Sequence, residues 1–297
     1  MERSLTMDVL ITGATGFVAG HLIPYLVRAG HRVYAAGHDP ARLARLSGAT
    51  PIFWDLAQPA LPDDLPSRID GVVHLAQANV PFPDQAAAMF AVNAAGTVRL
   101  LDYARGAGAT RFVFTSSGSV YGGGDRPWRE DDPTSGRDFY AATKIAAERA
   151  TLAYAPYFGT TILRLFAPYG PGQTGRLVPG LIERIRSGRP VTLVEGRGPR
   201  FNPLYVEHVV DVLAQALTGE GHQMLNAGGD EALSVRQMAE TIGRVLDRPP
   251  LLQDVPGQLT GDFVGDVTRL RQTFRLPARL NPFEEGVSRM LAMKNED

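Results

Sequence analysis

Two residues near the middle of the chain have the types and the spacing that proton transfer needs. Tyr140 and Lys144 are four positions apart, so in a helix both side chains lie on one face. An ammonium near a phenol favours the phenolate and lowers the phenol's pKa. The pair therefore predicts a proton donor and acceptor near neutral pH, which hydride transfer to or from a carbonyl carbon requires. Ser117, at the end of an apolar strand, is a candidate for a second hydroxyl at the substrate oxygen.

The spacing of Tyr140 and Lys144 also occurs in ordinary surface pairs, so its meaning depends on the rest of the chain. In the segment FVFTSSGSVYGG at residues 112–123, we expect Thr115 and Ser116 to bond the backbone or neighbouring groups. Ser119 is expected to be a secondary substrate contact.

A glycine-rich segment near the N-terminus predicts a site for a pyrophosphate. It reads TGATGFVAG at residues 12–20, after an apolar strand at 8–12 and before a helix at 17–28. Gly13 and Gly16 let a ligand approach the backbone, and the helix directs its N–H groups toward that place. Strand, loop and helix in this order predict dinucleotide binding.

The end of the second strand, residues 31–36, leaves the choice between NADP and NAD open. An acidic side chain there binds the ribose 2′-hydroxyl, whereas a basic environment accepts a 2′-phosphate. No acid stands at the strand end, and His38 and Arg42 favour NADP slightly over NAD. Asp39 comes two residues late, and because Pro40 is the next residue, it is equally typical of a helix N-cap.

Strands alternate with helices along the first half, which predicts an α/β fold with a Rossmann-type doubly wound parallel sheet. Expected strands are residues 8–12, 31–36, 50–54, 71–75, 111–115 and 160–165, and expected long helices are 17–28, 85–105 and 140–155. We expect a dinucleotide-binding domain at 1–166, with sheet strands returning near 204–206, and a smaller substrate-binding α/β lobe at 167–297.

The composition excludes several classes of protein. The 297 residues carry a formal net charge of −1, so the chain has no basic excess that would indicate a nucleic-acid partner. Cysteine is absent and the six histidines are scattered, so we expect neither disulfides nor a metal site. No apolar run is long enough to cross a membrane, and the N-terminus lacks the apolar region of a signal peptide, so a cytoplasmic protein is expected.

Together these segments resemble the extended short-chain dehydrogenase/reductase family, and within it the NAD(P)-dependent nucleotide-sugar epimerases and dehydratases, UDP-glucose 4-epimerase among them. The matching segments are Thr12 to Gly16, Asp55-Leu56, Val73 to Ala76, Asn93 with Gly96-Thr97, Thr115 to Ser117 with Val120 to Gly122, Tyr140 to Lys144, and Tyr169 to Gly172. They cover essentially the whole chain at the family's spacing.

The resemblance implies roles for particular residues. The catalytic set is Ser117, Tyr140 and Lys144, with Lys144 also holding the nicotinamide ribose. The implied cofactor contacts are Gly13, Thr15, Gly16, Phe17, Val18, His38, Arg42, Asp55, Leu56, Leu75, Ala76, Gln77, Asn93, Tyr140, Lys144, Ala167 and Pro168. The implied substrate contacts are Asn79, Ser117, Ser119, Arg176 and Arg200. Asp55 is alternatively a turn residue, Asn93 a bond to a neighbouring loop, and each arginine a solvated loop residue.

The residues directly after the fifth strand narrow the reaction. The 4,6-dehydratases carry an Asp-Glu pair there, and this chain has Gly118-Ser119, which argues against elimination. Two reactions remain: a 4-epimerase working through a keto intermediate, and an NADPH-dependent reductase of 4-keto sugars. A non-catalytic NADP-binding sensor is a further alternative, although such proteins usually lose the tyrosine or the lysine.

The substrate and the assembly are less tightly specified. Many family members have asparagine where this chain has Ala167, and Arg200 stands one residue further from the next helix than is usual. A nucleotide sugar, or a related polar small molecule, is the expected substrate. The family also implies a homodimer formed through the helices at 85–105 and 140–155, whose alanines permit close approach.

Overall fold

The computed structural model describes residues 6–292, which divide into two compact units. Within the described residues, the first unit comprises 6–120, 136–164 and 210–225, and the second comprises 121–135, 165–209 and 226–292. The units are therefore interleaved along the sequence. The chain passes between these units several times. The predicted domain boundary at residue 166 stays a prediction.

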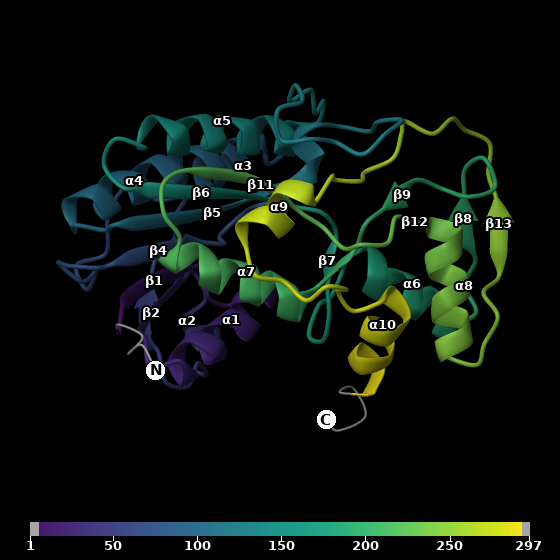
Figure 1. Cartoon of the computed structure of the whole chain (residues 1–297), viewed down its shortest axis with the longest axis horizontal. Coiled ribbons are helices and arrows are strands. Elements are labelled where there is room, and N and C mark those ends of the chain that lie inside the picture. The colour runs from purple at the N-terminus through teal and green to yellow at the C-terminus, as the bar shows by residue number, and fades with distance from the viewer. Residues whose placement is uncertain (1–5, 293–297) are drawn as a thin grey trace. The chain divides into compact units, whose positions relative to one another are not determined.

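A seven-stranded sheet in the order β11-β6-β5-β4-β1-β2-β3 forms the centre of the first unit (Figure 1). Its strands are β1 (Asp8–Thr12), β2 (Arg32–Gly37), β3 (Thr50–Phe53), β4 (Gly71–His74), β5 (Arg111–Ser117), β6 (Gly159–Leu165) and β11 (Gln223–Ala227). β1 pairs in parallel with both β2 and β4, β2 with β3, and β4 with β5. This order and direction confirm the α/β Rossmann-type fold.

The strand that returns to the sheet is β11, so the expectation of a return near residues 204–206 is wrong. β10 (Leu204–Tyr205) pairs instead with β7 (Pro168–Tyr169) in a separate two-stranded sheet. It runs straight into α7 (Val206–Thr218), which leaves two residues extended, whereas β11 provides five. A longer strand offers more backbone groups to the edge of the large sheet.

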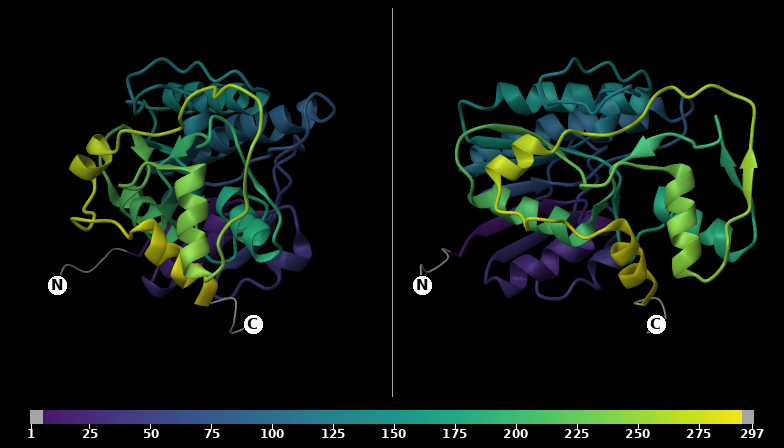
Figure 2. Two further views of the ribbon diagram at one scale, coloured as in Figure 1. Left: turned by 90° about the vertical axis from the view of Figure 1, so that its right-hand side faces the viewer. Right: turned by 45° about the vertical axis from the view of Figure 1, so that its right-hand side comes forward.

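Helices cover the sheet on both faces. Figures 1 and 2 show α3 (Ala86–Phe90), α4 (Gly96–Gly106) and α5 (Phe139–Ala153) on one side, and α1 (Phe17–Arg28) and α2 (Pro40–Leu43) on the other. A π-helical turn, η1 (Ala91–Ala95), joins α3 to α4, and a short 3₁₀ turn, η2 (Gly118–Val120), comes directly after β5. Apolar residues of the strands and of α4 form the core between the sheet and these helices.

Two aspartates begin helices of the first unit. Asp138 accepts a hydrogen bond from Ala141 N at 2.7 Å at the start of α5. Asp39 accepts one from Arg42 N at 3.1 Å, with Pro40 as the first residue of α2. The N-cap interpretation of Asp39 is thus confirmed.

The second unit consists of short paired strands and four helices. The strands are β7 and β10, β8 (Val191–Leu193) with β13 (Leu252–Asp254), and β9 (Arg200–Phe201) with β12 (Leu233–Ser234). The helices are α6 (Leu177–Arg186), α8 (Val235–Val245), α9 (Thr268–Thr273) and α10 (Phe283–Ala292). The apolar faces of α6, α8 and α10 form a core of their own.

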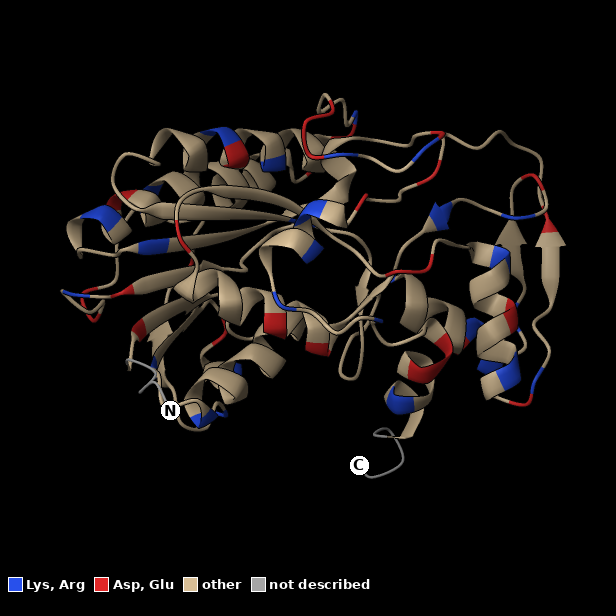
Figure 3. Cartoon of the chain, viewed as in Figure 1, with Lys and Arg blue, Asp and Glu red and all other residues tan. Residues whose placement is uncertain are grey.

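Charge is distributed without a dominant sign. Basic and acidic residues both occur on each unit in Figure 3, and the formal net charge of the chain is −1. Among residues 6–292, no helix combines the length and the apolar character that crossing a bilayer would demand.

Candidate active site

Tyr140 and Lys144 lie one turn apart on α5, as their spacing predicts. The Tyr140 hydroxyl donates to Gln77 Oε1 at 2.5 Å. The Lys144 ammonium donates to the carbonyl of Thr115 at 2.6 Å and lies 4.4 Å from the centre of the Phe114 ring. The helix therefore presents a phenol at its start and a buried cation one turn further along.

The environment of Lys144 makes its proton easy to lose. The side chain is 1% exposed, and burial lowers its pKa from 10.5 to about 7, an effect that the carboxylate of Glu148 partly opposes. The sequence contains only one other lysine, Lys294. An arginine could not take the place of Lys144 in this respect, because a guanidinium does not lose its proton in proteins.

The four hydroxyls around the end of β5 separate into two pairs. Thr115 Oγ1 donates to the carbonyl of His74 at 2.9 Å, and Ser116 Oγ donates to Glu148 Oε1 at 2.5 Å. Both bond neighbouring groups, as expected. Ser117 Oγ accepts from Ser119 N at 3.2 Å and lies 2.9 Å from Ser119 Oγ. Ser117 and Ser119 thus bond each other, and their contact with a substrate stays a prediction.

The glycine loop packs so closely against neighbouring backbone that a side chain at Gly13 or Gly16 would not fit. Gly13 has φ of +68°, and a Cβ added there would lie 2.7 Å from Ala76 N. A Cβ at Gly16, the N-cap of α1, would lie 3.0 Å from Gly13 O. A Cβ at either glycine would thus meet neighbouring backbone, and the first N–H groups of α1, which follow this loop, suit the phosphates of a dinucleotide.

Arg42 reaches the glycine loop from α2, where its guanidinium donates to the carbonyl of Thr15. His38 is exposed. Gly37, at the end of β2, has room for a side chain, because an added Cβ would meet nothing closer than 3.4 Å, at Leu43. This side of the loop thus has the Arg42 guanidinium nearby and no acid at the strand end.

A buried hydrogen-bonded chain begins at the residue before the glycine loop. Thr97 Oγ1 donates to Asn93 O at 2.7 Å, so it must accept from His74 Nε2, 2.9 Å away. His74 Nδ1 is then the acceptor for the hydroxyl of Thr12 at 2.6 Å. Burial, and secondarily the charge of Lys144, lowers the pKa of His74 to about 3. The neutral ring therefore keeps one tautomer and one direction of donation.

Asn93 continues this chain toward the catalytic helix from within the π-helical turn. Its amide donates to Ala78 O at 2.8 Å and to Thr143 Oγ1 at 3.0 Å, and its oxygen accepts from Ala78 N at 2.7 Å. Thr143 Oγ1 in turn donates to Tyr140 O at 2.7 Å. Asn93 thus makes the loop bond that was its alternative interpretation, while a cofactor contact stays a prediction.

Several further residues of the predicted cofactor set lie around β3 and β4. Asp55 accepts from Ala57 N at 2.9 Å, the geometry of a turn, and its contact with adenine stays a prediction. Leu56 is buried, whereas Gln77 and Asn79 are exposed on the loop after β4. The first unit therefore brings together the predicted residues Gly13, Thr15, Gly16, Phe17, Val18, His38, Arg42, Asp55, Leu56, Leu75, Ala76, Gln77, Asn79, Asn93, Ser117, Ser119, Tyr140 and Lys144.

Ala167, Pro168, Arg176 and Arg200 belong to the second unit. Arg200 and Arg197 both bond the carboxylate of Asp262, at 2.7 and 2.8 Å. Asp262 Oδ1 also accepts from Arg200 N at 2.8 Å, and its pKa is lowered to about 2. Two cations on one carboxylate leave a net positive charge on this group of three side chains. Arg176 is exposed at the start of α6.

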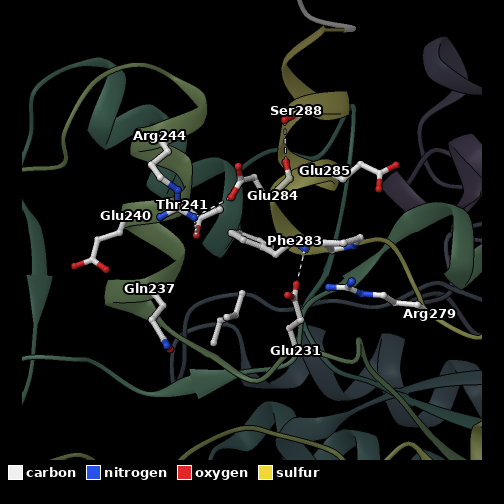
Figure 4. A pocket seen from close by; sticks show the side chains of 12 residues that line it. Glu231, Gln237, Glu240, Thr241, Arg244, Arg279, Phe283, Glu284, Glu285 and Ser288 are labelled. Atoms are coloured by element: carbon white, nitrogen blue, oxygen red, sulfur yellow. Dashed lines mark hydrogen bonds and ion pairs between the residues drawn. The ribbon is translucent and has the colours of Figure 1, made fainter.

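A polar groove of about 780 Å³ lies between α8 and α10 in the second unit (Figure 4). Glu240 and Arg244 line it from α8, and Glu284 from α10, where Arg244 and Glu284 are 2.9 Å apart. Among the described residues, those of the predicted site are not part of its lining.

A buried ion pair beneath the site was not predicted from the sequence. Arg164 bonds Glu148 through two nitrogens, at 2.9 and 2.7 Å, and both side chains are 4% exposed. Glu148 stands one turn after Lys144 on the same face of α5, and that spacing was the available signal. The pair anchors α5 to β6 and adds a negative charge near Lys144.

The depressed pKa of Lys144 predicts how stability depends on pH. Between pH 7 and 10.5 the unfolded chain keeps this proton and the folded protein does not, so rising pH favours the folded state. Below pH 7 both states are protonated and the full cost of the buried charge is present. We expect the unfolding free energy of the wild type, minus that of Lys144→Met, to rise across this window and to be flat below it.

Urea unfolding at a series of pH values measures this difference. Arg149→Met is the control, since Arg149 is an exposed cation on the same helix and should give no pH-dependent difference. A difference between wild type and Lys144→Met that falls with pH, or stays constant, would contradict the expected proton loss.

Ala167 predicts a second stability change. Its φ of 42° is in the left-handed region, which costs an ordinary side chain about 1–2 kcal/mol and which asparagine tolerates better. The backbone thus has the conformation suited to the asparagine that many family members carry. We expect Ala167→Asn to raise the urea midpoint by the equivalent of about 1 kcal/mol. Ala278→Asn, at an exposed residue without positive φ, should leave it unchanged. A lowered midpoint for Ala167→Asn would show that the strain is not relieved.

Comparison with known proteins agrees with this geometry. The model of the NAD dependent epimerase/dehydratase family matches residues 9–228. GDP-6-deoxy-D-mannose reductase of Pseudomonas aeruginosa is 31% identical over 287 residues, covering 90% of this chain and 86% of that protein. The dTDP-D-glucose 4,6-dehydratase of Mus musculus is 27% identical over 316 residues, covering 96% and 88%.

A solved structure has the same fold as this chain. MoeE5 in complex with UDP-glucuronic acid and NAD is 28% identical, with a TM-score of 0.84 over 97% of this chain and 99% of that one. The relatives thus include a reductase and a dehydratase of nucleotide sugars. Since the family model spans most of the chain, this protein belongs to the NAD dependent epimerase/dehydratase family of extended short-chain dehydrogenases/reductases.

Proposed function

We propose that the chain is an NAD(P)-dependent nucleotide-sugar 4-epimerase. The observation that carries the proposal is the arrangement on α5 and β5: the Tyr140 phenol, the Lys144 cation one turn away and the Ser117 hydroxyl at the strand end belong to one compact unit. The same unit contains a glycine loop that suits a dinucleotide. These are the parts that a reversible hydride transfer needs.

The protein's side chains would move one proton in each half of the reaction. Tyr140, as phenolate, takes the proton of the sugar C4 hydroxyl, and Ser117 donates a hydrogen bond to the carbonyl oxygen that forms. A bound nicotinamide supplies the hydride acceptor and later the donor. In its protonated form, Lys144 stabilises the phenolate by its charge. After the keto sugar has turned its other face, Tyr140 returns the proton to the oxygen.

The residues after Ser117 support epimerisation over elimination. Gly118 and Ser119 stand where a dehydratase needs an acid and a base, and residues 112–124 contain no charged side chain. The substrate class is supported by the net positive group of Arg197, Arg200 and Asp262, which suits a diphosphate. The MoeE5 structures contain UDP-glucuronic acid or UDP-glucose together with NAD, which makes these two sugars the first substrates to test.

A reductase of 4-keto sugars is the second candidate. It is favoured by Gly37 at the strand end, with His38 and Arg42 nearby, because this environment suits the 2′-phosphate of NADP. The resemblance to GDP-6-deoxy-D-mannose reductase points the same way. It would use Tyr140, Lys144 and Ser117 in the same roles, but in one direction.

We also propose a homodimer. Ala87 and Ala88 on α3 and Ala142 and Ala146 on α5 are exposed, and Phe90 is 50% exposed beside them in sequence. Small and apolar residues on these helices suit the close packing of a second copy.

The function is tested by the cofactor that the purified protein contains. Denaturation should release NAD or NADP in an amount close to that of the protein, since an epimerase regenerates its cofactor in place. The native protein should then interconvert C4 epimers of UDP-glucuronic acid or UDP-glucose without added cofactor. An empty protein that oxidises added NADPH only with a 4-keto sugar would overturn the epimerase proposal in favour of the reductase.

A further inference from the structure

Gln77 lies outside the predicted catalytic set, yet its side chain contacts the proposed acid–base group. The Tyr140 hydroxyl donates to Gln77 Oε1 at 2.5 Å. Gln77 is exposed on the loop after β4, and the sequence predicts only a cofactor contact for it. The substrate oxygen must also lie within hydrogen-bonding distance of this phenol, so Gln77 Oε1 lies close to the place that the substrate oxygen would take.

We infer that Gln77 is a positioning residue whose amide holds the hydroxyl of Tyr140 in place in both its protonated and its deprotonated form. This inference rests on the role of Tyr140 in the proposed function. A carboxamide has an acceptor oxygen and a donor NH₂ on one plane. The oxygen accepts from the phenol, as observed. Half a turn about the terminal torsion, which has two broad minima, brings Nε2–H to the same place for the phenolate.

This dual capacity matters for a reaction that runs in both directions. Tyr140 would take a proton in the first half of an epimerisation and return it in the second. A carboxylate in place of Gln77 could only accept, and would favour the phenol, whereas an ammonium could only donate, and would favour the phenolate. An amide stabilises either form, so it does not commit the enzyme to oxidation or to reduction.

The scaffold around Gln77 fixes it relative to Tyr140. Asn93 bonds both the N–H and the carbonyl of Ala78, the next residue in the loop, and it also bonds Thr143 on α5. Loop and helix are therefore tied together by three bonds of 2.7 to 3.0 Å. Holding Gln77 against Tyr140 consequently costs little additional conformational entropy.

Few charged groups compete for the phenol along the packed elements. The loop at residues 75–83 and the segment at 112–124 contain no charged side chain. α5 and the two residues before it carry Arg137, Asp138, Lys144, Glu148 and Arg149. Asp138 caps the helix, Lys144 bonds Thr115, and Glu148 bonds Arg164. A new charge at position 77 would therefore be a large local perturbation.

Titration of Tyr140 in the protein without substrate tests the inference. For each protein, the phenolate absorbance of the same protein with Tyr140→Phe is subtracted. The difference is the absorbance of the Tyr140 phenolate alone. We expect Gln77→Glu to raise its titration midpoint by about one pH unit or more, because a carboxylate opposes the phenolate. Gln272→Glu, at an exposed residue of α9 in the second unit, should not change it. An unchanged midpoint in Gln77→Glu would overturn the inference.

Steady-state kinetics separates positioning from cofactor binding. Loss of one hydrogen bond to the phenol in Gln77→Met should lower kcat about tenfold and leave the dissociation constant of the cofactor unchanged. A weaker cofactor with unchanged kcat would assign Gln77 to the cofactor instead. The titration needs no turnover, so it tests the inference even if the proposed function is wrong. A wrong proposed function would show separately, as a wild type without activity. Should the methionine variant not fold, the near-isosteric Gln77→Glu decides.

Discussion

The buried ammonium of Lys144 is the constraint on which the site depends. It is held between the Thr115 carbonyl and the Phe114 ring, and burial brings its pKa down to about 7. A cation in this position favours a phenolate at Tyr140, but its desolvation has a cost that the fold must offset. The carboxylate of Glu148 offsets part of this desolvation cost, and Glu148 itself accepts hydrogen bonds from Ser116 and Arg164. Lys144, Ser116 and Glu148 thus each have a partner in the folded protein.

A second network relates the glycine loop to the catalytic helix. From Thr12 the bonds pass through His74 and Thr97 to the π-helical turn, and from Asn93 through Thr143 to the backbone of Tyr140. Because the ring of His74 is neutral, each link has one direction and no proton can redistribute within it. This network thereby connects the glycine loop to the start of α5, where Tyr140, the proposed acid–base group, lies.

Local pattern in the sequence was enough to predict the sheet and the helix that carries Tyr140 and Lys144 on one face. Alternating apolar segments indicated the sheet and its helices, and the spacing of Tyr140 and Lys144 indicated the helix face. The features that could not be predicted depend on contacts between distant residues. Asn93 bonds residues 15 and 50 positions away. The return of β11 to the sheet was missed because β10 is equally apolar, and only its length distinguishes it.

Turnover and cofactor binding of Tyr140→Phe, measured together, test the central claim most directly. The claim is that the phenol transfers a proton and that the rest of the site only binds and orients. Loss of the hydroxyl should lower kcat by about a hundredfold or more, while the cofactor dissociation constant stays within a few-fold of the wild type. Tyr157→Phe, at a 61% exposed tyrosine of the same unit, should match the wild type in both measurements. A Tyr140→Phe variant with normal kcat on a substrate that the wild type converts would contradict this role of the phenol.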